Sequence, residues 1–177
     1  MAIIHYQFEA IHPFYDGNGR TGRLLNVLFL VMNNKIDLPI LYLSKYIINN
    51  KKEYYKLLRK CNEDIKNIED FIVYMLKAIE ETAVFTINFI KEVNNSYQTT
   101  CEQIHKKLPK IYRKELVDAI YFEFYTKNIY FQKYLDISRA TATTYLKLLV
   151  KEGFLTEEKI GKEVIYKNIS LLNLVKY

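Results

Sequence analysis

The sequence has few cysteines, few glycines and no long apolar run, and each shortage excludes a class of protein. Its 177 residues include two cysteines, five glycines, three prolines and no tryptophan. Cys61 and Cys101 lie far apart and show no CxxC or Cys/His spacing, so neither a disulfide framework nor a zinc knuckle is predicted. We expect both cysteines to be free thiols.

No stretch approaches the ~18 consecutive apolar residues of a membrane-spanning helix, and Met1 to His5 lack the basic start of a secretion signal. With 50% hydrophobic and 26% charged residues, the composition is typical of a globular protein and excludes disordered and collagen-like classes. We therefore expect a soluble, cytoplasmic protein without a membrane partner. The 26 basic and 20 acidic residues give a net charge of +6, which suits anionic partners.

The few glycines are unevenly placed, since Gly17, Gly19 and Gly22 fall within six residues. Apolar residues at helical spacing predict one helix before this glycine loop, over residues 2–11, and another after it, over residues 20–32. Two further short helices are expected within residues 41–62. Ser44 and Asn50 are their candidate N-caps, because Ser and Asn side chains accept hydrogen bonds from the first free amides of a helix.

A long segment, residues 68–108, contains neither glycine nor proline and predicts one long helix, or two if the polar residues 94–100 interrupt it. Its apolar or small residues alternate in steps of four and three, apart from one skipped position. This series is Ile72, Leu76, Ile79, Ala83, Thr86, Ile90, Val93, Tyr97 and Ile104. The helix is expected either to pack on the core of its own domain or to form the seam of a homodimer.

The pattern changes after Pro109, so we divide the chain into domains at residues 1–108 and 109–177. Beyond Pro109 we expect helices over residues 113–125, 130–135 and 139–151, then two strands meeting at Gly161 and Lys162. This order predicts a winged helix-turn-helix. The fold class is then mainly α, a helical core followed by a small α+β domain.

DNA binding is one interpretation of the second domain, which carries twelve basic and eight acidic residues. Ser138 would cap the helix that enters the major groove, and Lys159 and Lys162 would meet phosphate from the wing. The candidate DNA-contacting residues on that helix are Arg139, Thr141, Thr143, Thr144 and Lys147, opposite a buried face of Ala142, Tyr145, Leu146 and Leu149. The alternative is a module for protein docking or dimerisation.

The glycine loop has the chemistry of a phosphate site. Its closely spaced glycines let successive amides turn toward one centre, to which the following helix adds its positive N-terminal end. Arg20 and Arg23 lie on the first turn of that helix and are suited to bind phosphate oxygens. Asp16 is a hard oxygen ligand for Mg2+, and His12 accepts a proton near neutral pH. The alternative is a tight helix-to-helix turn with surface arginines.

This loop, His12-Pro13-Phe14-Tyr15-Asp16-Gly17-Asn18-Gly19-Arg20-Thr21-Gly22-Arg23, resembles the signature of the Fic family, HPFxxGNGRxxR with an acidic residue before the first glycine. The resemblance covers residues 5–60 and implies transfer of AMP from ATP to a Ser, Thr or Tyr hydroxyl of a target protein. It also implies a helical core.

The resemblance implies a role for each loop residue. His12 is the general base, Phe14 anchors the loop in the core, and Asp16 holds Mg2+. The phosphate-binding residues are Gly17, Asn18, Gly19, Arg20, Thr21, Gly22 and Arg23. Asn50 and Tyr54 are expected to approach the adenine.

The sequence departs from the family pattern at its start, where eleven residues precede His12. Family members carry a longer N-terminal part whose β-hairpin flap clamps the target side chain, so we expect binding of nucleotide with impaired transfer. The inhibitory motif of the family, Ser/Thr-x-x-x-Glu-Gly/Asn, does not occur in this sequence. The alternative function is a DNA-binding transcriptional regulator in which a Fic remnant senses nucleotide.

Overall fold

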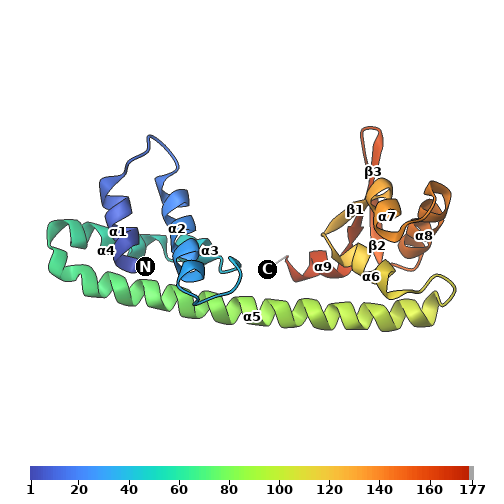
Figure 1. Ribbon diagram of the computed structural model, residues 1–177, viewed down its shortest axis with the longest axis horizontal. Helices are drawn as coiled ribbons and strands as arrows, with labels where there is room; N and C mark the ends of the chain where they lie inside the picture. The colour runs from blue at the N-terminus through green and yellow to red at the C-terminus, as the bar shows by residue number, and fades with distance from the viewer. Residues whose placement is uncertain (176–177) are drawn as a thin grey trace. The chain divides into compact units, whose positions relative to one another are not determined.

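The computed structural model describes residues 1–175, and the chain divides into two compact units, Met1–Asn88 and Phe89–Tyr177. The fold is mainly α-helical with one small antiparallel sheet, as the sequence predicts (Figure 1). Among these residues no helix is both long enough and apolar enough to cross a membrane. The cysteines, Cys61 and Cys101, are free.

Unit 1 begins with two helices, α1 (Ala2–Ile11) and α2 (Asn18–Met32), which pack against each other on either side of the glycine loop (Figure 1). After them come α3 (Leu43–Asn49), α4 (Lys51–Glu63) and the 3-10 turn η1 (Ile65–Asn67). Tyr6, Tyr54, Leu57, Phe71 and Met75 form the centre of the buried cluster that joins α1, α4 and α5. This cluster holds α1, one of the two helices that flank the glycine loop, against α4 and α5.

Neither Ser44 nor Asn50 caps a helix through its side chain, so both predicted side-chain N-caps are wrong. α3 begins at Leu43, one residue before Ser44, because the Ser44 hydroxyl accepts a hydrogen bond from Arg23 instead of capping the helix. Asn50 does occupy the N-cap position of α4, but its side-chain amide donates to the carbonyl of Tyr46 at 3.0 Å. The Asn50 side chain therefore closes the end of α3 and does not cap the start of α4.

The long helix α5 (Ile68–Lys107) is continuous through residues 94–100. Its buried face in unit 1 is Phe71, Met75 and Ala78, one position before the apolar series that the sequence suggested. Leu76 of that series is 58% exposed, whereas Ile104 is fully buried in the core of unit 2. The helix therefore packs on the core of its own unit in each half, and part of the expected seam faces solvent.

Unit 2 contains α6 (Lys114–Tyr121), β1 (Tyr125–Lys127), α7 (Asn128–Leu135), α8 (Arg139–Lys151), β2 (Leu155–Ile160), β3 (Glu163–Asn168) and α9 (Ile169–Leu174). The expected helix over residues 113–125 ends at Tyr121 because residues 125–127 pair with β3 as an edge strand. The strand order is β1-β3-β2, and both pairs are antiparallel.

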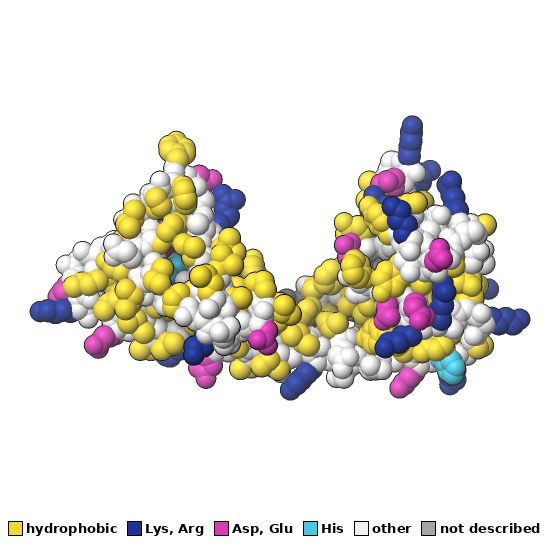
Figure 2. Space-filling model, viewed as in Figure 1, with side chains coloured by type: hydrophobic (Ala, Val, Ile, Leu, Met, Phe, Trp, Pro, Cys, Tyr) yellow, Lys and Arg dark blue, Asp and Glu magenta, His cyan; other side chains and the backbone are white. Residues whose placement is uncertain are grey.

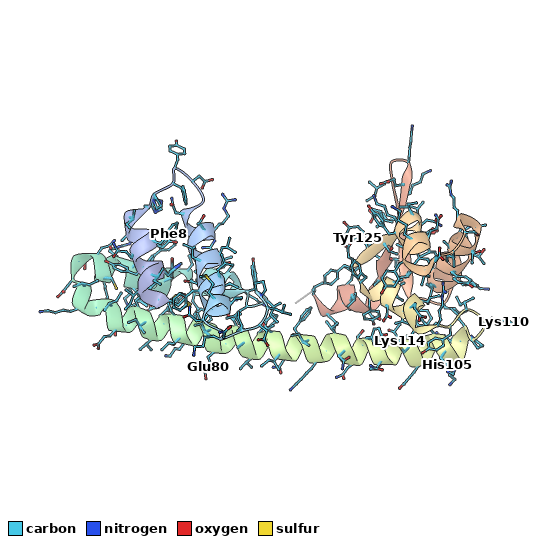
Figure 3. The ribbon with its side chains drawn as sticks, in the orientation of Figure 1. Phe8, Glu80, His105, Lys110, Lys114 and Tyr125 are labelled. Carbon is cyan, nitrogen blue, oxygen red and sulfur yellow. The ribbon has the colours of Figure 1, made fainter. Side chains whose placement is uncertain are left out.

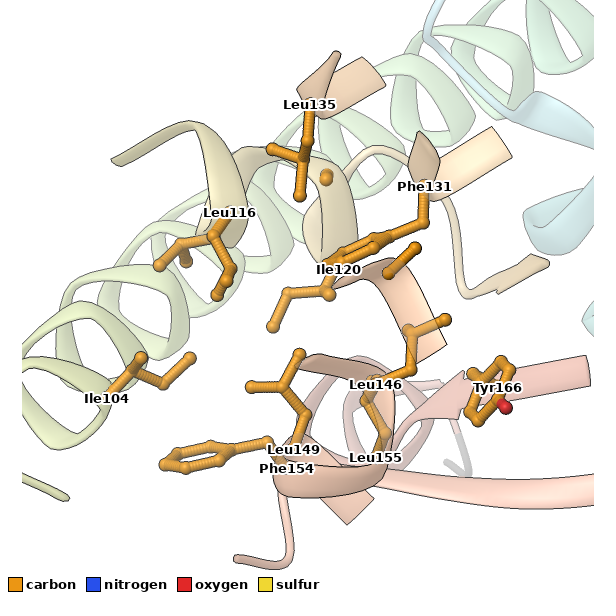
Figure 4. Close-up of a cluster of buried hydrophobic side chains, with 13 residues drawn as sticks. Ile104, Leu116, Ile120, Phe131, Leu135, Leu146, Leu149, Phe154, Leu155 and Tyr166 are labelled. Carbon is orange, nitrogen blue, oxygen red and sulfur yellow. The ribbon is translucent and has the colours of Figure 1, made fainter. Parts of the chain in front are cut away.

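A single apolar cluster holds these elements together (Figure 4). Leu116 and Ile120 of α6, Phe131 of α7, and Leu146 and Leu149 of α8 are almost completely buried in it. The predicted buried face of the 139–151 helix is confirmed at Ala142, Leu146 and Leu149, while Tyr145 is half-buried. Ser138 caps α8 as expected, since its hydroxyl accepts a hydrogen bond from the Thr141 amide at 3.2 Å.

Candidate functional site

The glycine loop reverses the chain between α1 and α2 through two residues in the left-handed conformation. His12, the C-cap of α1, has φ 50° and ψ 55°, and its amide donates to the carbonyl of Phe8. Gly17, the N-cap of α2, has φ 90°, a backbone conformation that glycine adopts without steric cost. His12 thus ends one helix, and the loop leads from it to the positive N-terminal end of the next.

Asn18 closes the loop from within. Its side-chain oxygen accepts from the Phe14 amide at 2.9 Å, and its side-chain nitrogen donates to the Phe14 carbonyl. Because Asn18 is 2% exposed and both of its amide atoms are bonded, its side chain shapes the loop and only its backbone amide is left for an anion. Thr21 has a similar structural bond, from its hydroxyl to the Gly17 carbonyl at 3.1 Å.

The two arginines of the loop lie over its glycines. A Cβ atom added to Gly17 would lie 3.6 Å from Arg20 Nη2, and one added to Gly19 would lie 3.1 Å from Arg23 Nη1. The first amides of a helix have no partner within the helix, so guanidinium groups and free N–H donors converge at the same turn. The sequence predicts an anion site at this turn, where Arg20 is open to solvent and Arg23 is half-buried.

Asp16 is already engaged at both oxygens. Its Oδ1 accepts from the Gly17 amide at 2.7 Å and its Oδ2 from Arg20 Nη2 at 3.1 Å. Within residues 1–175 no group of three or more His, Cys, Asp and Glu side chains could hold a metal ion. A single carboxylate beside a phosphate site still fits Mg2+, which commonly takes one protein carboxylate together with substrate phosphates and water.

Phe14 departs from its expected role as a core anchor, since it is 49% exposed. Its ring lies 6.1 Å from that of Phe8, which is labelled on α1 in Figure 3. Phe14 therefore contacts the last turns of α1, and its side chain is not buried in the core, whereas that of Asn18 is buried.

Gly22 packs α2 against α1 and does not face the anion site. A Cβ atom at this position would lie 2.6 Å from Glu9 Oε1 and 3.0 Å from His5 Cε1, so neighbouring side chains of α1 would have to shift. The space that a side chain at Gly22 would fill is occupied by α1. The expected contact of Gly22 with nucleotide stays a prediction. The glycine spacing in the sequence did not distinguish these two uses.

Glu9 lies between the loop and the core of unit 1. Its Oε1 is buried and has no hydrogen-bond partner among the described residues. Burial raises the pKa of Glu9, and the neighbouring charges of His12 and Arg23 oppose that rise. The carboxyl group is thus close enough to influence both the candidate base and a candidate phosphate ligand.

Sequence reasoning missed the residues that position Arg23 and the hollow beside it. Arg23 Nε donates to the Ser44 hydroxyl at 2.9 Å. Arg20, Arg23, Leu24, Tyr42 and Ser44 line part of a hollow of about 610 Å³ next to the anion site. No local pattern in the sequence predicts these contacts, because Tyr42 and Ser44 lie at the start of α3, far along the chain from Arg23.

Asn50 and Tyr54 were expected near the adenine, and the structure places them differently. Tyr54 is 3% exposed, and its hydroxyl lies 2.8 Å from His5 Nε2, so no free surface remains for a nucleotide. The Tyr54 side chain belongs to the core of unit 1, and its expected approach to adenine stays a prediction. Asn50 is exposed at the start of α4 and lines a separate hollow with Lys45, Tyr46 and Phe85.

The candidate DNA-contacting residues of unit 2 lie on α8, where Arg139, Thr144 and Lys147 are exposed. The threonine hydroxyls are already bonded locally: Thr143 and Thr144 donate to carbonyls one turn earlier, at 2.8 and 3.0 Å. Thr141 bonds Ser138. Arg139 and Thr143 line a hollow of about 500 Å³ that also includes Lys162 of the hairpin turn.

Two family models match separate parts of the chain. A model described as Fic/DOC family matches residues 1–30, which contain the loop. A model described as the C-terminal domain of SoFic-like protein adenylyltransferase matches residues 97–171.

The chain is also similar in sequence to curated proteins. The protein adenylyltransferases Fic of Drosophila grimshawi and Drosophila melanogaster are each 35% identical to the chain over 81 residues. The matched region is 46% of this chain, and the chain spans about 15% of the length of these relatives.

Proposed function

Because the chain is a member of the Fic family, we propose that it binds Mg-ATP at the loop of residues 12–23 and transfers AMP to a hydroxyl group of a target protein. The observation that carries this proposal is the convergence of Arg20 and Arg23 over Gly17 and Gly19, at the helix turn that follows His12. The relatives are named as protein adenylyltransferases, which supports the choice of ATP as the donor.

The phosphates bind at the first turn of α2. Free amides of Asn18, Gly19 and Arg20 and the positive end of the helix dipole attract the anion without any change in the backbone. The guanidinium of Arg20 contacts the terminal phosphates from the solvent side, and that of Arg23 closes the opposite side. Charge-assisted bonds of this kind hold the triphosphate in one orientation.

His12 takes the proton from the attacking hydroxyl of the target. The hydroxyl oxygen then forms a bond to the α-phosphorus of ATP, while the bond from that phosphorus to the bridging oxygen of the β-phosphate breaks. AMP remains on the target protein, pyrophosphate leaves, and the proton stays on the imidazole ring of His12 until it passes to water. Catalysis in this scheme is mainly positioning and charge stabilisation.

Asp16 is the residue that would hold Mg2+ beside the phosphates. The ion, when bound, neutralises charge that develops on the leaving pyrophosphate. Asp16 Oδ2 now accepts from Arg20, so binding of Mg-ATP requires Arg20 to exchange this exposed ion pair for phosphate oxygens. Such an exchange costs little, because an ion pair open to water contributes about 1 kcal/mol or less.

Calorimetry with ATP tests the phosphate assignment. We expect ATP binding to require Mg2+ in both the parent protein and the Arg20→Ala variant. Arg20→Ala should weaken this binding about 30-fold, because ~2 kcal/mol of charge-assisted bonding is lost. Arg59→Ala on the exposed surface of α4 is the matched control and should leave the affinity unchanged. Equal affinities of the Arg20→Ala variant and the parent would remove the phosphate assignment.

Transfer is tested with ATP that carries its label on the α-phosphate. We expect label to appear on protein in a lysate and to disappear with His12→Ala, while that variant keeps its affinity for ATP because His12 acts on the incoming hydroxyl. Label that persists in His12→Ala would contradict the assigned base.

A DNA-binding regulator that senses nucleotide is the second candidate function. The order α6, β1, α7, α8, β2, β3 supports a winged helix-turn-helix, and Arg139 and Lys162 share one hollow between α8 and the hairpin turn. We expect duplex DNA to bind in a salt-dependent manner and Arg139→Ala to weaken binding, with Lys110→Ala as the control. Binding that is independent of salt and of Arg139 would rule this function out.

Self-association as a homodimer is the remaining partner proposal. Leu24, Leu28 and Met32 form an exposed apolar row along α2, and Met32 is 81% exposed. Figure 2 shows hydrophobic side chains exposed over the α1 and α2 region of unit 1. Because exposed apolar patches of this kind favour association, we expect a dimer in sedimentation at micromolar concentration. A monomer near 21 kDa would contradict it.

A further inference from the structure

His5 is a completely buried histidine on α1 that the proposed reaction does not use. Its Nε2 lies 2.8 Å from the Tyr54 hydroxyl of α4, and its Nδ1 lies 3.1 Å from Asn26 Nδ2 of α2. Its ring stacks on Phe71 of α5, with the ring centroids 6.2 Å apart and the planes 5° from parallel. One side chain therefore contacts all three helices that surround α1 in this core.

The hydrogen bonds define the protons on the ring. The amide nitrogen of Asn26 is a donor only, so Nδ1 of His5 accepts, and in the neutral ring Nε2 then carries the hydrogen and donates to Tyr54. Burial lowers the pKa of His5, and the charge of Arg23 adds to this effect, whereas the Gly22 backbone opposes it. The ring is neutral at pH 7 and satisfies both of its nitrogens.

The His5 side chain lies between the two helices, α1 and α2, that flank the glycine loop. His5 lies on α1 seven residues before His12, the C-cap of that helix, which is about two helical turns along the chain. On α2, His5 meets Gly22 and Asn26, which are one turn apart and directly flank the turn that carries Arg23. Any slip of α1 along α2 would change the position of His12 relative to the amides of Asn18, Gly19 and Arg20.

We propose that His5 is a positioning residue that fixes the axial register of α1 on α2, through Asn26 and Tyr54, and thereby places His12 opposite the phosphate-binding turn. This inference rests on the proposed function for its catalytic consequence, but the register itself is a property of the fold. Glu9, one turn beyond His5, packs close to Gly22 and so also resists sliding of α1 along α2. The two hydrogen bonds of His5 add a requirement on the direction of the donor and acceptor groups.

His5→Phe is the first test, because phenylalanine keeps a ring that can stack on Phe71 and removes both hydrogen bonds. We expect ATP affinity to change less than about threefold, whereas the transfer rate at saturating ATP falls by up to about 100-fold, the effect of misplacing a reacting group by an ångström. His5→Gln retains a donor toward Tyr54 and should recover part of the rate. His105→Phe, at an exposed histidine of α5, is the matched control and should change neither quantity.

Nuclear magnetic resonance of the imidazole rings gives a readout that does not depend on transfer. The sequence holds three histidines, so their ring signals are readily assigned from single variants. We expect His5 to be protonated at Nε2 and not at Nδ1, and His5→Phe to shift the ring signals of His12 and the amide signals of residues 17–20. A folded His5→Phe protein with unchanged His12 and loop signals would overturn the inference, as would an Nδ1-protonated His5.

The two proposals fail differently. If the parent protein transfers no label while His5→Phe still displaces the His12 and loop signals, the proposed function fails and the positioning role of His5 stands. If His5→Phe does not fold, Tyr54→Phe removes a single hydrogen bond with the least change in volume. It should then produce the smaller displacement of the same signals, and unchanged signals there would also overturn the inference.

Discussion

Arg23 and Ser44 are joined by a hydrogen bond of 2.9 Å from the guanidinium Nε to the hydroxyl oxygen. This bond ties the second arginine of the glycine loop to the first turn of α3. It leaves the two terminal nitrogens of the guanidinium available for an anion, so Ser44 holds the ligand-binding group without competing for it.

Ser44→Ala should therefore weaken binding of ATP although Ser44 touches no phosphate. We expect a loss of about three- to tenfold, because a freed arginine side chain must be ordered again when the ligand binds. The unfolding free energy should fall by only about 1 kcal/mol. Calorimetry and urea unfolding measure the two quantities, and Ser44→Thr, which retains the hydroxyl, is the control.

The loop glycines should differ in their tolerance of alanine. Gly22→Ala places a Cβ atom 2.6 Å from Glu9 Oε1 and 3.0 Å from Cε1 of the buried His5 ring, which has little room to move, so we expect α1 to be displaced and stability to fall by ~2 kcal/mol. At Gly19 the atom nearest to an added Cβ is 3.1 Å away, on the flexible end of Arg23. Gly19→Ala should cost less stability than Gly22→Ala in urea unfolding, and equal losses would contradict the packing of α1 on α2.

His12 adopts a backbone conformation that favours glycine. Substitutions at this position should therefore change the free energy of unfolding differently even where they abolish transfer equally. His12→Ala and His12→Gly both remove the base and should both abolish transfer. His12→Gly should be more stable than His12→Ala by about 1 kcal/mol, because a side chain at φ 50° is disfavoured. Thermal unfolding of the two variants measures the difference, and a more stable His12→Ala would show that α1 ends in another conformation.

Burial of His5 predicts a loss of stability in mild acid. The pKa of the folded protein's His5 lies below the ordinary value of 6.5, so between these two values the unfolded chain binds a proton that the folded chain excludes. The neutral His5 ring therefore contributes fully to the free energy of unfolding above pH 6.5. This contribution is lost as the pH falls toward the pKa of His5 in the folded protein, with a slope of up to ~1.4 kcal/mol per pH unit. His5→Gln should flatten this slope, whereas the control His105→Gln should retain it.

The amino-acid sequence determined the glycine loop because its interactions are local. Asp16 pairs with Arg20 and Asn18 bonds Phe14, each four residues apart, and these contacts follow once a helix begins at residue 18. The same holds for α8, whose start at Ser138 and buried face follow from the hydroxyl cap and the helical period. Spacing and residue type suffice where the partners belong to one turn.

The tertiary structure alone decided which apolar row of α5 is buried and which distant residues meet. Apolar residues occupy both the row of Phe71, Met75 and Ala78 and the next row, so helical period cannot distinguish the face that packs. His5 and Tyr54 are 49 residues apart, and Arg23 and Ser44 are 21 apart, and no local pattern encodes either pair. Such contacts form only when helices pack, because burial then forces each polar group to find a partner.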